Sequence, residues 1–165
     1  MPITVILLKG DFIMYVLKAI ISRKNIIQKI ANDWINSISI DLLQDFAIII
    51  MTPAFLDDIL ELSDEKNFPY FKDFQSFSLP VAHLIQSYSF HTQLAYIEID
   101  YSTPSWNKCY GVFIEKQNIG KHPLCGRDGI NHILQKIGVQ KMQYNDEIDC
   151  LHLEHYWKFS KYIKK

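Results

Sequence analysis

Apolar runs and helix-period stretches alternate through the first part of the chain. Residues 14–21 are apolar and β-branched, and residues 46–51 are apolar throughout, as in a strand that is covered on both faces. Apolar residues recur at helical spacing over 23–36, and again behind Thr52 and Pro53, which suit the start of a helix. This order of strand, helix, strand and helix predicts a βαβ unit.

The pattern also predicts how these two helices begin and which face each one buries. Ser22 is a suitable N-cap for the first helix. In the second helix, Phe55, Ile59 and Leu62 form an apolar stripe, and the acidic residues lie on the opposite face. We therefore expect the second helix to pack on a sheet and to expose its acids.

A long loop, a helix and a hairpin follow. Residues 63–78 are polar and aromatic and are typical of a loop, and Ser78 with Pro80 predicts the start of a third helix. Apolar and polar residues alternate over 95–101, and a second β-type run covers 109–116. The short polar segment between the two runs predicts a hairpin with a longish loop.

A fourth helix is predicted between Asp128, as its N-cap, and Gly138, as the glycine just past its end. Its inward face carries four apolar residues: Ile130, Ile133, Leu134 and Ile137. Residues 146–165 would add one or two further helical turns. No repeat, low-complexity tract or linker divides the chain.

Together these elements predict a single globular domain over residues 14–165, of the α/β or α+β class. We expect a central mixed sheet of about four to five strands with helices packed on it. The length of 165 residues and the content of 48% hydrophobic and 21% charged residues are usual for one folded domain. Residues 1–13 are either a translated leader before a start at Met14 or an ordinary N-terminal extension with a strand at 3–8. The leader is considered because codons for residues 9–14 can read as a ribosome-binding site.

Cysteine usage and hydropathy exclude several classes of protein. The three cysteines are widely spaced and no signal peptide precedes them, which indicates reduced thiols in the cytoplasm rather than a disulfide framework. No apolar run is long enough for a transmembrane helix, so no membrane role is expected. The chain carries no phosphate loop, dinucleotide fingerprint or metalloprotease motif, so we predict no cofactor and no catalytic residue.

Charge is divided unevenly although the net charge is only −1. The first hundred residues are acidic and the remainder is basic. The stretch 30–65 contains eight acids and no lysine or arginine. Such a block creates a negative field that attracts a basic partner, although solubility alone would also account for it. We take five acids as candidate partner-binding residues: Asp57, Asp58, Glu61, Asp64 and Glu65.

Two carboxylates on one strand form an alternative site. Glu98 and Asp100 share one face of the 95–101 run, and such a pair can perform acid–base chemistry or hold a divalent cation. With Asn131 they would make a ligand or enzyme site on the polar face of the 95–116 hairpin. The alternative without a functional role is that these carboxylates belong to a solvent-exposed polar face of the sheet.

The second half contains three weaker candidate features. Cys150, His152 and His155 could contact a metal, but further ligands at zinc-type spacing are missing, so no metal site is predicted. The glycines and arginine of 126–129 precede a helix, where an anion could bind. The C-terminal lysines are interspersed with aromatic residues, as in some nucleic-acid-binding surfaces. Four lysines provide little positive charge for such a surface, so we expect no nucleic-acid binding.

The second half resembles a family of small bacterial proteins. The resemblance covers roughly 93–155 and is carried by the patterns YIExDY at 96–101, GINxxLxxxGV at 129–139 and DEID at 146–149. A short Leu-x-Leu segment follows at 151–153. Family members carry a glycine-rich loop with a glutamine after the first of these patterns, and residues 102–108 depart from it.

In overall character, the family is similar to the immunity proteins that neutralise toxins of contact-dependent and other polymorphic toxin systems. The resemblance implies a binding protein rather than an enzyme. The expected function is therefore inhibition of a cognate protein toxin, a basic nuclease whose active site the acidic surface occludes. Neither the toxin's identity nor the oligomeric state follows from the residues.

Overall fold

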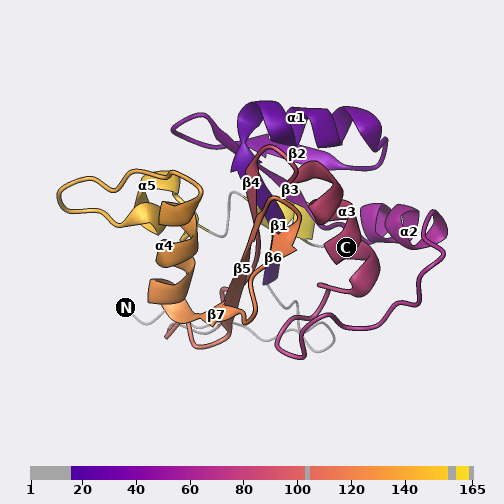
Figure 1. The fold of residues 1–165 in the computed structure, drawn as a ribbon. Helices are drawn as coiled ribbons and strands as arrows, with labels where there is room; N and C mark the ends of the chain where they lie inside the picture. The colour runs from indigo at the N-terminus through magenta and orange to yellow at the C-terminus, as the bar shows by residue number, and fades with distance from the viewer. Residues whose placement is uncertain (1–15, 103–104, 156–158, 164–165) are drawn as a thin grey trace.

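A single seven-stranded sheet forms the centre of the molecule. The structure, a computed structural model, describes residues 16–102, 105–155 and 159–163, so the leader considered for residues 1–13 lies outside them. Figure 1 shows the sheet between two groups of helices. The strands are β1 (Val16–Arg23), β2 (Ile38–Asp41), β3 (Phe46–Ile50), β4 (Gln93–Asp100), β5 (Cys109–Glu115), β6 (Asn118–Ile119) and β7 (Leu124–Cys125). The helices are α1 (Lys24–Asp33), α2 (Pro53–Glu61), α3 (Leu79–Tyr88), α4 (Gly126–Lys136), α5 (Glu147–Leu151) and α6 (Ser160–Ile163).

The strand order is β2-β3-β1-β4-β5-β6, with β7 beside β5, and every pairing between the described strands is antiparallel. The α+β class and the single compact domain are thus confirmed. The predicted mixed sheet and βαβ unit are wrong, because the short strand β2 reverses the chain between α1 and β3. Its tight turn uses Gln44 and Asp45 at φ of 57° and 62°. Five of the strands have four or more residues, in line with the predicted number.

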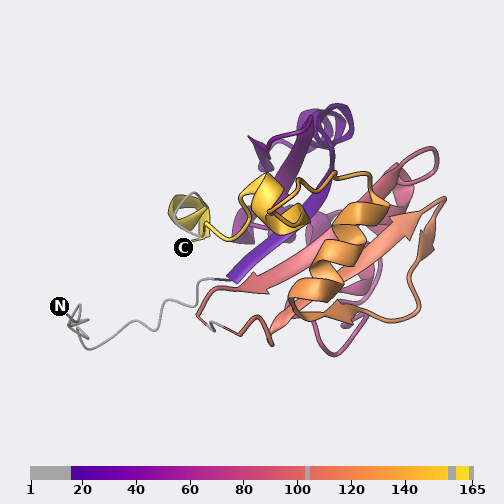
Figure 2. The same cartoon turned by 90° about the vertical axis from the view of Figure 1, so that its left-hand side faces the viewer.

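Helices cover both faces of this sheet. One core lies between the sheet and α4, α5 and α6, and the other lies between the sheet and α1, α2 and α3. The view in Figure 2 shows α4 crossing over the long strands on the first of these faces. The alternation of β4 is confirmed, because Ala95 and Ile97 point to the first core and Tyr96 to the second. A strand such as β3 is therefore buried at all five residues.

Helix ends follow the sequence signals in part. Thr52 caps α2 as predicted, since its side chain accepts a hydrogen bond from the Phe55 N–H at 3.3 Å. Gly138 follows α4 at φ 99°, the left-handed conformation expected just past a helix end. The prediction for Ser22 is wrong: it lies buried in β1 and donates its hydroxyl to Gln93 O at 2.7 Å. A buried hydroxyl needs a partner, and this strand contact supplies it.

Two further boundary predictions are also wrong. Asp128 is not the N-cap of α4, because the helix begins earlier, at Gly126 behind Cys125, and Asp128 lies in its first turn. Leu62 is not part of the inward stripe of α2, because the helix ends at Glu61. Leu62 is instead 77% exposed.

Helix α4 approaches β5 closely at Gly111. A Cβ added to Gly111 would lie 2.6 Å from Ile133 Cδ1 and 3.1 Å from Ile130 Cδ1. Both isoleucines are fully buried, so neither can move aside without disturbing the core. The glycine therefore fixes the distance at which α4 lies above the sheet.

Gly111→Ala should reduce the free energy of unfolding by about 1–3 kcal/mol through overpacking. Ile133→Val removes the clashing methyl and by itself should cost about 0.5–1.5 kcal/mol. Combined in one chain, the two changes should cost less than their sum, as measured by urea denaturation. Gly120→Ala is the matched control, because its Cβ would meet only ordinary contacts at 3.5 Å. Additive losses would contradict this account of Gly111.

Candidate functional site

Glu98 holds the long loop against the sheet. Its side chain lies on the face of β4 that carries α1, α2 and α3, and the residue is 3% exposed. Its carboxylate accepts hydrogen bonds from Gln75 N–H at 2.7 Å, from Ser76 N–H at 2.8 Å and from the Tyr96 hydroxyl at 2.9 Å. Lys18 Nζ donates to Ser76 Oγ at 2.9 Å and ties the same turn to β1. Both oxygens of this buried carboxylate are thus used by the chain itself.

The other two members of the alternative site lie elsewhere. Asp100 is 7% exposed and accepts hydrogen bonds from the N–H and hydroxyl of Ser102, at 2.9 and 2.5 Å. Asn131 belongs to α4, which lies on the opposite face of the sheet from Glu98. The structure therefore does not bring Glu98, Asp100 and Asn131 together, and the hairpin face is buried rather than solvated.

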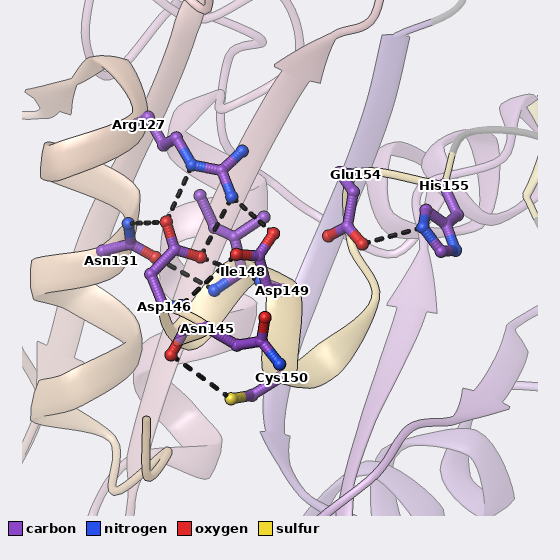
Figure 3. Close-up of polar contacts among 9 residues, drawn as sticks. All are labelled: Arg127, Asn131, Asn145, Asp146, Ile148, Asp149, Cys150, Glu154 and His155. Carbon is purple, nitrogen blue, oxygen red and sulfur yellow. Dashed lines mark hydrogen bonds and ion pairs between the residues drawn. The ribbon is translucent and has the colours of Figure 1, made fainter. Parts of the chain in front are cut away.

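Arg127 joins the start of α5 to α4 (Figure 3). Its guanidinium makes two hydrogen bonds to Asp146, at 2.7 and 3.0 Å, and one to Asp149 at 2.7 Å. Asn131 adds a hydrogen bond from its amide to Asp146 at 2.9 Å and accepts one from Ile148 N–H at 3.0 Å. The arginine weighed as an anion site is thus already paired with two carboxylates.

This cluster brings together residues of two of the three sequence patterns in the second half. The GINxxLxxxGV pattern supplies Asn131, and the DEID pattern supplies Asp146 and Asp149, which form a capping box at the start of α5. Because α5 has only five residues, it is too short to be stable alone. The patterns therefore meet at a joint that fixes α5 on α4.

The electrostatics of the cluster favour the ionised form of Asp146. Partial burial on its own raises the pKa of Asp146, but the hydrogen bonds from Arg127, Asp149 N–H and Asn131 and the positive charge of Arg127 hold it below its ordinary value of 3.8. Tyr96 changes in the other direction: burial, the adjacent charge of Glu98 and their hydrogen bond raise the pKa of its hydroxyl well above 10. The phenol therefore stays protonated and can donate to Glu98.

The cysteine and histidine residues near the C-terminus make local contacts. Cys150 is buried with its thiol 3.8 Å from Asn145 O, and His155 Nε2 lies 2.8 Å from Glu154 Oε1 (Figure 3). The rings of His152 and His155 are 5.3 Å apart. In the part of the chain that the structure describes, no group of three potential ligands could hold a metal ion. Nor does any helix of that part have the length and hydropathy to cross a membrane.

The five candidate partner-binding acids fall into two sets. Asp58 accepts a hydrogen bond from the Asn36 amide at 3.0 Å, and Glu65 pairs with His83. Asp57, Glu61 and Asp64 are exposed and have no hydrogen bond or ion pair through their side chains to any described residue. The first two are four residues apart and so share one face of α2, and the third follows just after the helix ends. We call these three residues the α2 acidic surface.

Apolar groups and a cavity lie beside the α2 acidic surface. Leu62 is 77% exposed and Phe68 is 59% exposed. A cavity of about 200 Å³ lies between α2 and the loop that Glu98 holds, and its lining includes Leu60 of α2 and Phe74 of the loop. Exposed apolar groups, a cavity and a charged margin are the usual parts of a protein–protein interface.

Similarity to known proteins adds nothing to this picture. No protein-family model, no curated protein and no solved structure matches the chain.

Sequence reasoning missed two parts of this surface. Leu62 is exposed because α2 ends at Glu61. The apolar stripe in the sequence predicted a longer helix with Leu62 on its buried face. The hydrogen bonds from Gln75 and Ser76 to Glu98, which we call the Glu98 clamp, join residues more than twenty positions apart. No local sequence pattern predicts them. A sign was nevertheless present, because a carboxylate within a strand that is covered on both faces must find donors.

Glu98→Ala should lower the free energy of unfolding by about 3 kcal/mol or more, because the buried Tyr96 hydroxyl and two partly buried backbone N–H groups lose their charged acceptor. Glu98→Gln keeps the shape and one acceptor oxygen and should show a smaller loss. Glu61→Ala, which removes an exposed glutamate, should change stability by no more than about 0.5 kcal/mol. Chemical denaturation measures all three, and an unchanged Glu98→Ala protein would contradict the clamp.

Stability should also depend on pH through Asp146. Because its folded pKa lies below 3.8, its contribution is complete above the unfolded pKa and is lost as the pH falls through the folded value. Arg127→Met should cost about 1–3 kcal/mol at neutral pH and make the acid-side loss shallower. Lys24→Met breaks the exposed pair with Asp41 and should change neither the stability nor the pH profile appreciably. Equal acid profiles for wild type and Arg127→Met would count against this role.

Proposed function

We propose that the chain is an immunity protein that binds and neutralises a cognate bacterial toxin, a basic nuclease, by occluding its active site. It would act in the cytoplasm as a binding protein and not as an enzyme, without a cofactor. The observation that carries the proposal is the α2 acidic surface, three exposed acids without partners among the described residues. An acidic patch of this kind complements the basic surface that a nuclease presents to nucleic acid.

The surroundings of these acids support a protein as the partner. The exposed side chains of Leu62 and Phe68 can supply apolar contact at the centre of an interface. The cavity between α2 and the loop can receive one side chain of the partner. The acids would then form the rim, where charges accelerate and orient association more than they add to affinity.

The charge around α2 supports long-range attraction. The stretch 30–65 has eight acids and no lysine or arginine, and the acids of the α2 acidic surface have no counterion among the described residues. Uncompensated charges at the surface produce a field that reaches about 8–10 Å at physiological salt. The rate at which a basic partner associates should therefore depend on ionic strength.

The buried carboxylates support binding over catalysis. Glu98 is saturated by donors from the loop and from Tyr96, and Arg127 is paired with Asp146 and Asp149. A general acid or base must reach a substrate, and a carboxylate whose donors come from its own fold is poorly placed for that role.

Growth rescue tests the proposal. Genomic fragments of the source organism are expressed from an inducible promoter in a bacterial host, with and without the chain. We expect a toxin fragment that stops growth only when the chain is absent and that forms a stable complex with it after purification. The proposal fails if the chain rescues growth from none of the toxic fragments.

Charge neutralisation tests the surface. In the variant Asp57→Asn/Glu61→Gln/Asp64→Asn, the association rate with the purified toxin should fall by about tenfold at low salt and lose most of its salt dependence. The control variant Asp128→Lys/Gln135→Lys makes the same change in net charge, +3, on the exposed side of α4. Its association rate should stay within about twofold of wild type, because α4 lies on the other face of the sheet. If both variants slowed association equally, the association rate would depend on the net charge of the chain and not on the α2 acidic surface.

A further inference from the structure

Strand β2 lies at one end of the sheet, and among the described strands it pairs only with β3. Hydrogen bonds at both ends of β3 show which residues face which neighbour. Lys24 N–H donates to Asp45 O at 2.8 Å and Met51 N–H to Lys18 O at 2.8 Å, so the odd-numbered residues of β3 bond to β1. Its even-numbered residues therefore bond to β2, as Leu42 N–H does to Phe46 O at 2.8 Å.

The alternation fixes the outward groups of β2. Ile38 and Ile40, opposite Ile50 and Ile48, bond to β3. The backbone N–H and C=O groups of Ser39 and Asp41 consequently point away from the sheet. Both residues are exposed, and no described residue makes a backbone hydrogen bond to these outward groups.

Apolar surface adjoins the start of this free edge. Ile35, three residues before β2, is 94% exposed. It lines a cavity of about 550 Å³ together with Ile38 of β2, Pro53 at the start of α2 and Tyr162 of α6. A partly apolar cavity at the end of an open strand can receive a side chain from a peptide that lies along the strand.

The free edge is continuous with the surface proposed to bind the toxin. Asn36, which lines the same cavity, donates its amide to Asp58 of α2 at 3.0 Å. The edge also lies wholly within the acidic stretch 30–65, and Asp41 places a carboxylate at its far end. Asp41 pairs with Lys24 of α1, which precedes the stretch 30–65, so the stretch itself still contains no basic residue.

We propose that β2 binds an extended, basic segment of the partner as an additional antiparallel or parallel strand, with the backbone groups of Ser39 and Asp41 as its hydrogen-bonding sites. This inference rests on the proposed function for the identity of the partner, and it specifies how that partner docks. The acids around β2 favour a basic segment, since a cross-strand pair of opposite charges stabilises pairing and a pair of like charges opposes it.

The features of β2 also limit unwanted pairing. The strand has four residues, and a charged residue ends it, which are common means by which proteins protect an open edge from aggregation. A short edge of this kind offers few backbone bonds, so charge and the cavity must supply the selectivity. A basic strand would match the acidic charge around β2, and an apolar residue near one end of that strand would fit the cavity.

Amide exchange and a peptide test the docking mode on the full chain. In the free chain, the Ser39 and Asp41 amides should exchange fast and the Ile40 amide slowly, as followed by NMR. A short synthetic peptide of alternating lysine and valine should slow the exchange of Ser39 and Asp41. The same peptide with alternate backbone nitrogens methylated, or with glutamate in place of lysine, should bind at least about tenfold more weakly.

Ser39→Pro is the matching variant, because it removes an N–H that points outward and leaves the bonds to β3 in place. It should weaken peptide binding by about tenfold or more, whereas Ser39→Thr, which keeps the N–H and favours strands, should bind like wild type. Should Ser39→Pro fail to fold, the exchange pattern of the unmodified chain still decides. Protected Ser39 and Asp41 amides in the free chain, no peptide binding, or equal binding by Ser39→Pro would each overturn the inference.

Growth rescue separates this inference from the proposed function. If the chain and a folded Ser39→Pro variant rescue growth equally well, the toxin proposal stands and the edge inference fails. If no toxin is found but the lysine–valine peptide protects Ser39 and Asp41, the edge binds basic strands and the toxin proposal fails. If Ser39→Pro loses both peptide binding and rescue while Ser39→Thr keeps them, both are supported.

Discussion

Coverage of both sheet faces is the constraint on which the rest of this structure depends. All five residues of β3 are buried, and β4 carries apolar side chains to a core on each face. Polar groups inside such a sheet must be satisfied by the protein, since water cannot reach them. Glu98 meets this requirement by binding the loop, and that contact in turn shapes one wall of the cavity beside α2. A carboxylate that resembles a catalytic group in the sequence thus serves to build the surface.

The same coverage moves the exposed chemistry to the periphery. With helices on both faces, the outer side of α2 and the edge of β2 are two of the accessible features of the described residues. Both lie in the acidic stretch 30–65, which the single hydrogen bond between Asn36 and Asp58 links across the start of β2. Four of the eight acids in that stretch have partners in the fold, including Asp33 with Tyr88 and Asp41 with Lys24. The structure was needed to separate the unpartnered acids from the paired ones, because nothing in the sequence shows that Asp58 and Glu65 have partners and Asp57, Glu61 and Asp64 do not.

Periodic patterns predicted the elements well and their connections poorly. The long strands, the four main helices, the Thr52 cap and the Gly138 terminator follow from local rules, because each depends on residues a few positions apart. Strand direction depends on β2, whose four residues lack a distinct pattern between α1 and β3. The proposed alternative site failed to assemble for a related reason: sequence shows which face of a strand Glu98 occupies, but not that α4, with Asn131, lies on the other side of the sheet. Two of the three resemblance patterns were informative in a different way, since Asn131 of the second and the aspartates of the third meet in the Arg127 cluster that holds α5.

The turn between β2 and β3 is hydrogen-bonded to the segment that follows α4. Gln44 donates its side-chain amide to Gln140 O at 2.7 Å and accepts a hydrogen bond from Gln140 N–H at 2.8 Å, which mimics a pair of strand hydrogen bonds. These two hydrogen bonds hold the hairpin to the segment after α4. If a second strand docked on the hairpin as proposed, little conformational entropy would remain to be lost, and even a few backbone contacts would contribute to affinity without the cost of ordering a flexible loop.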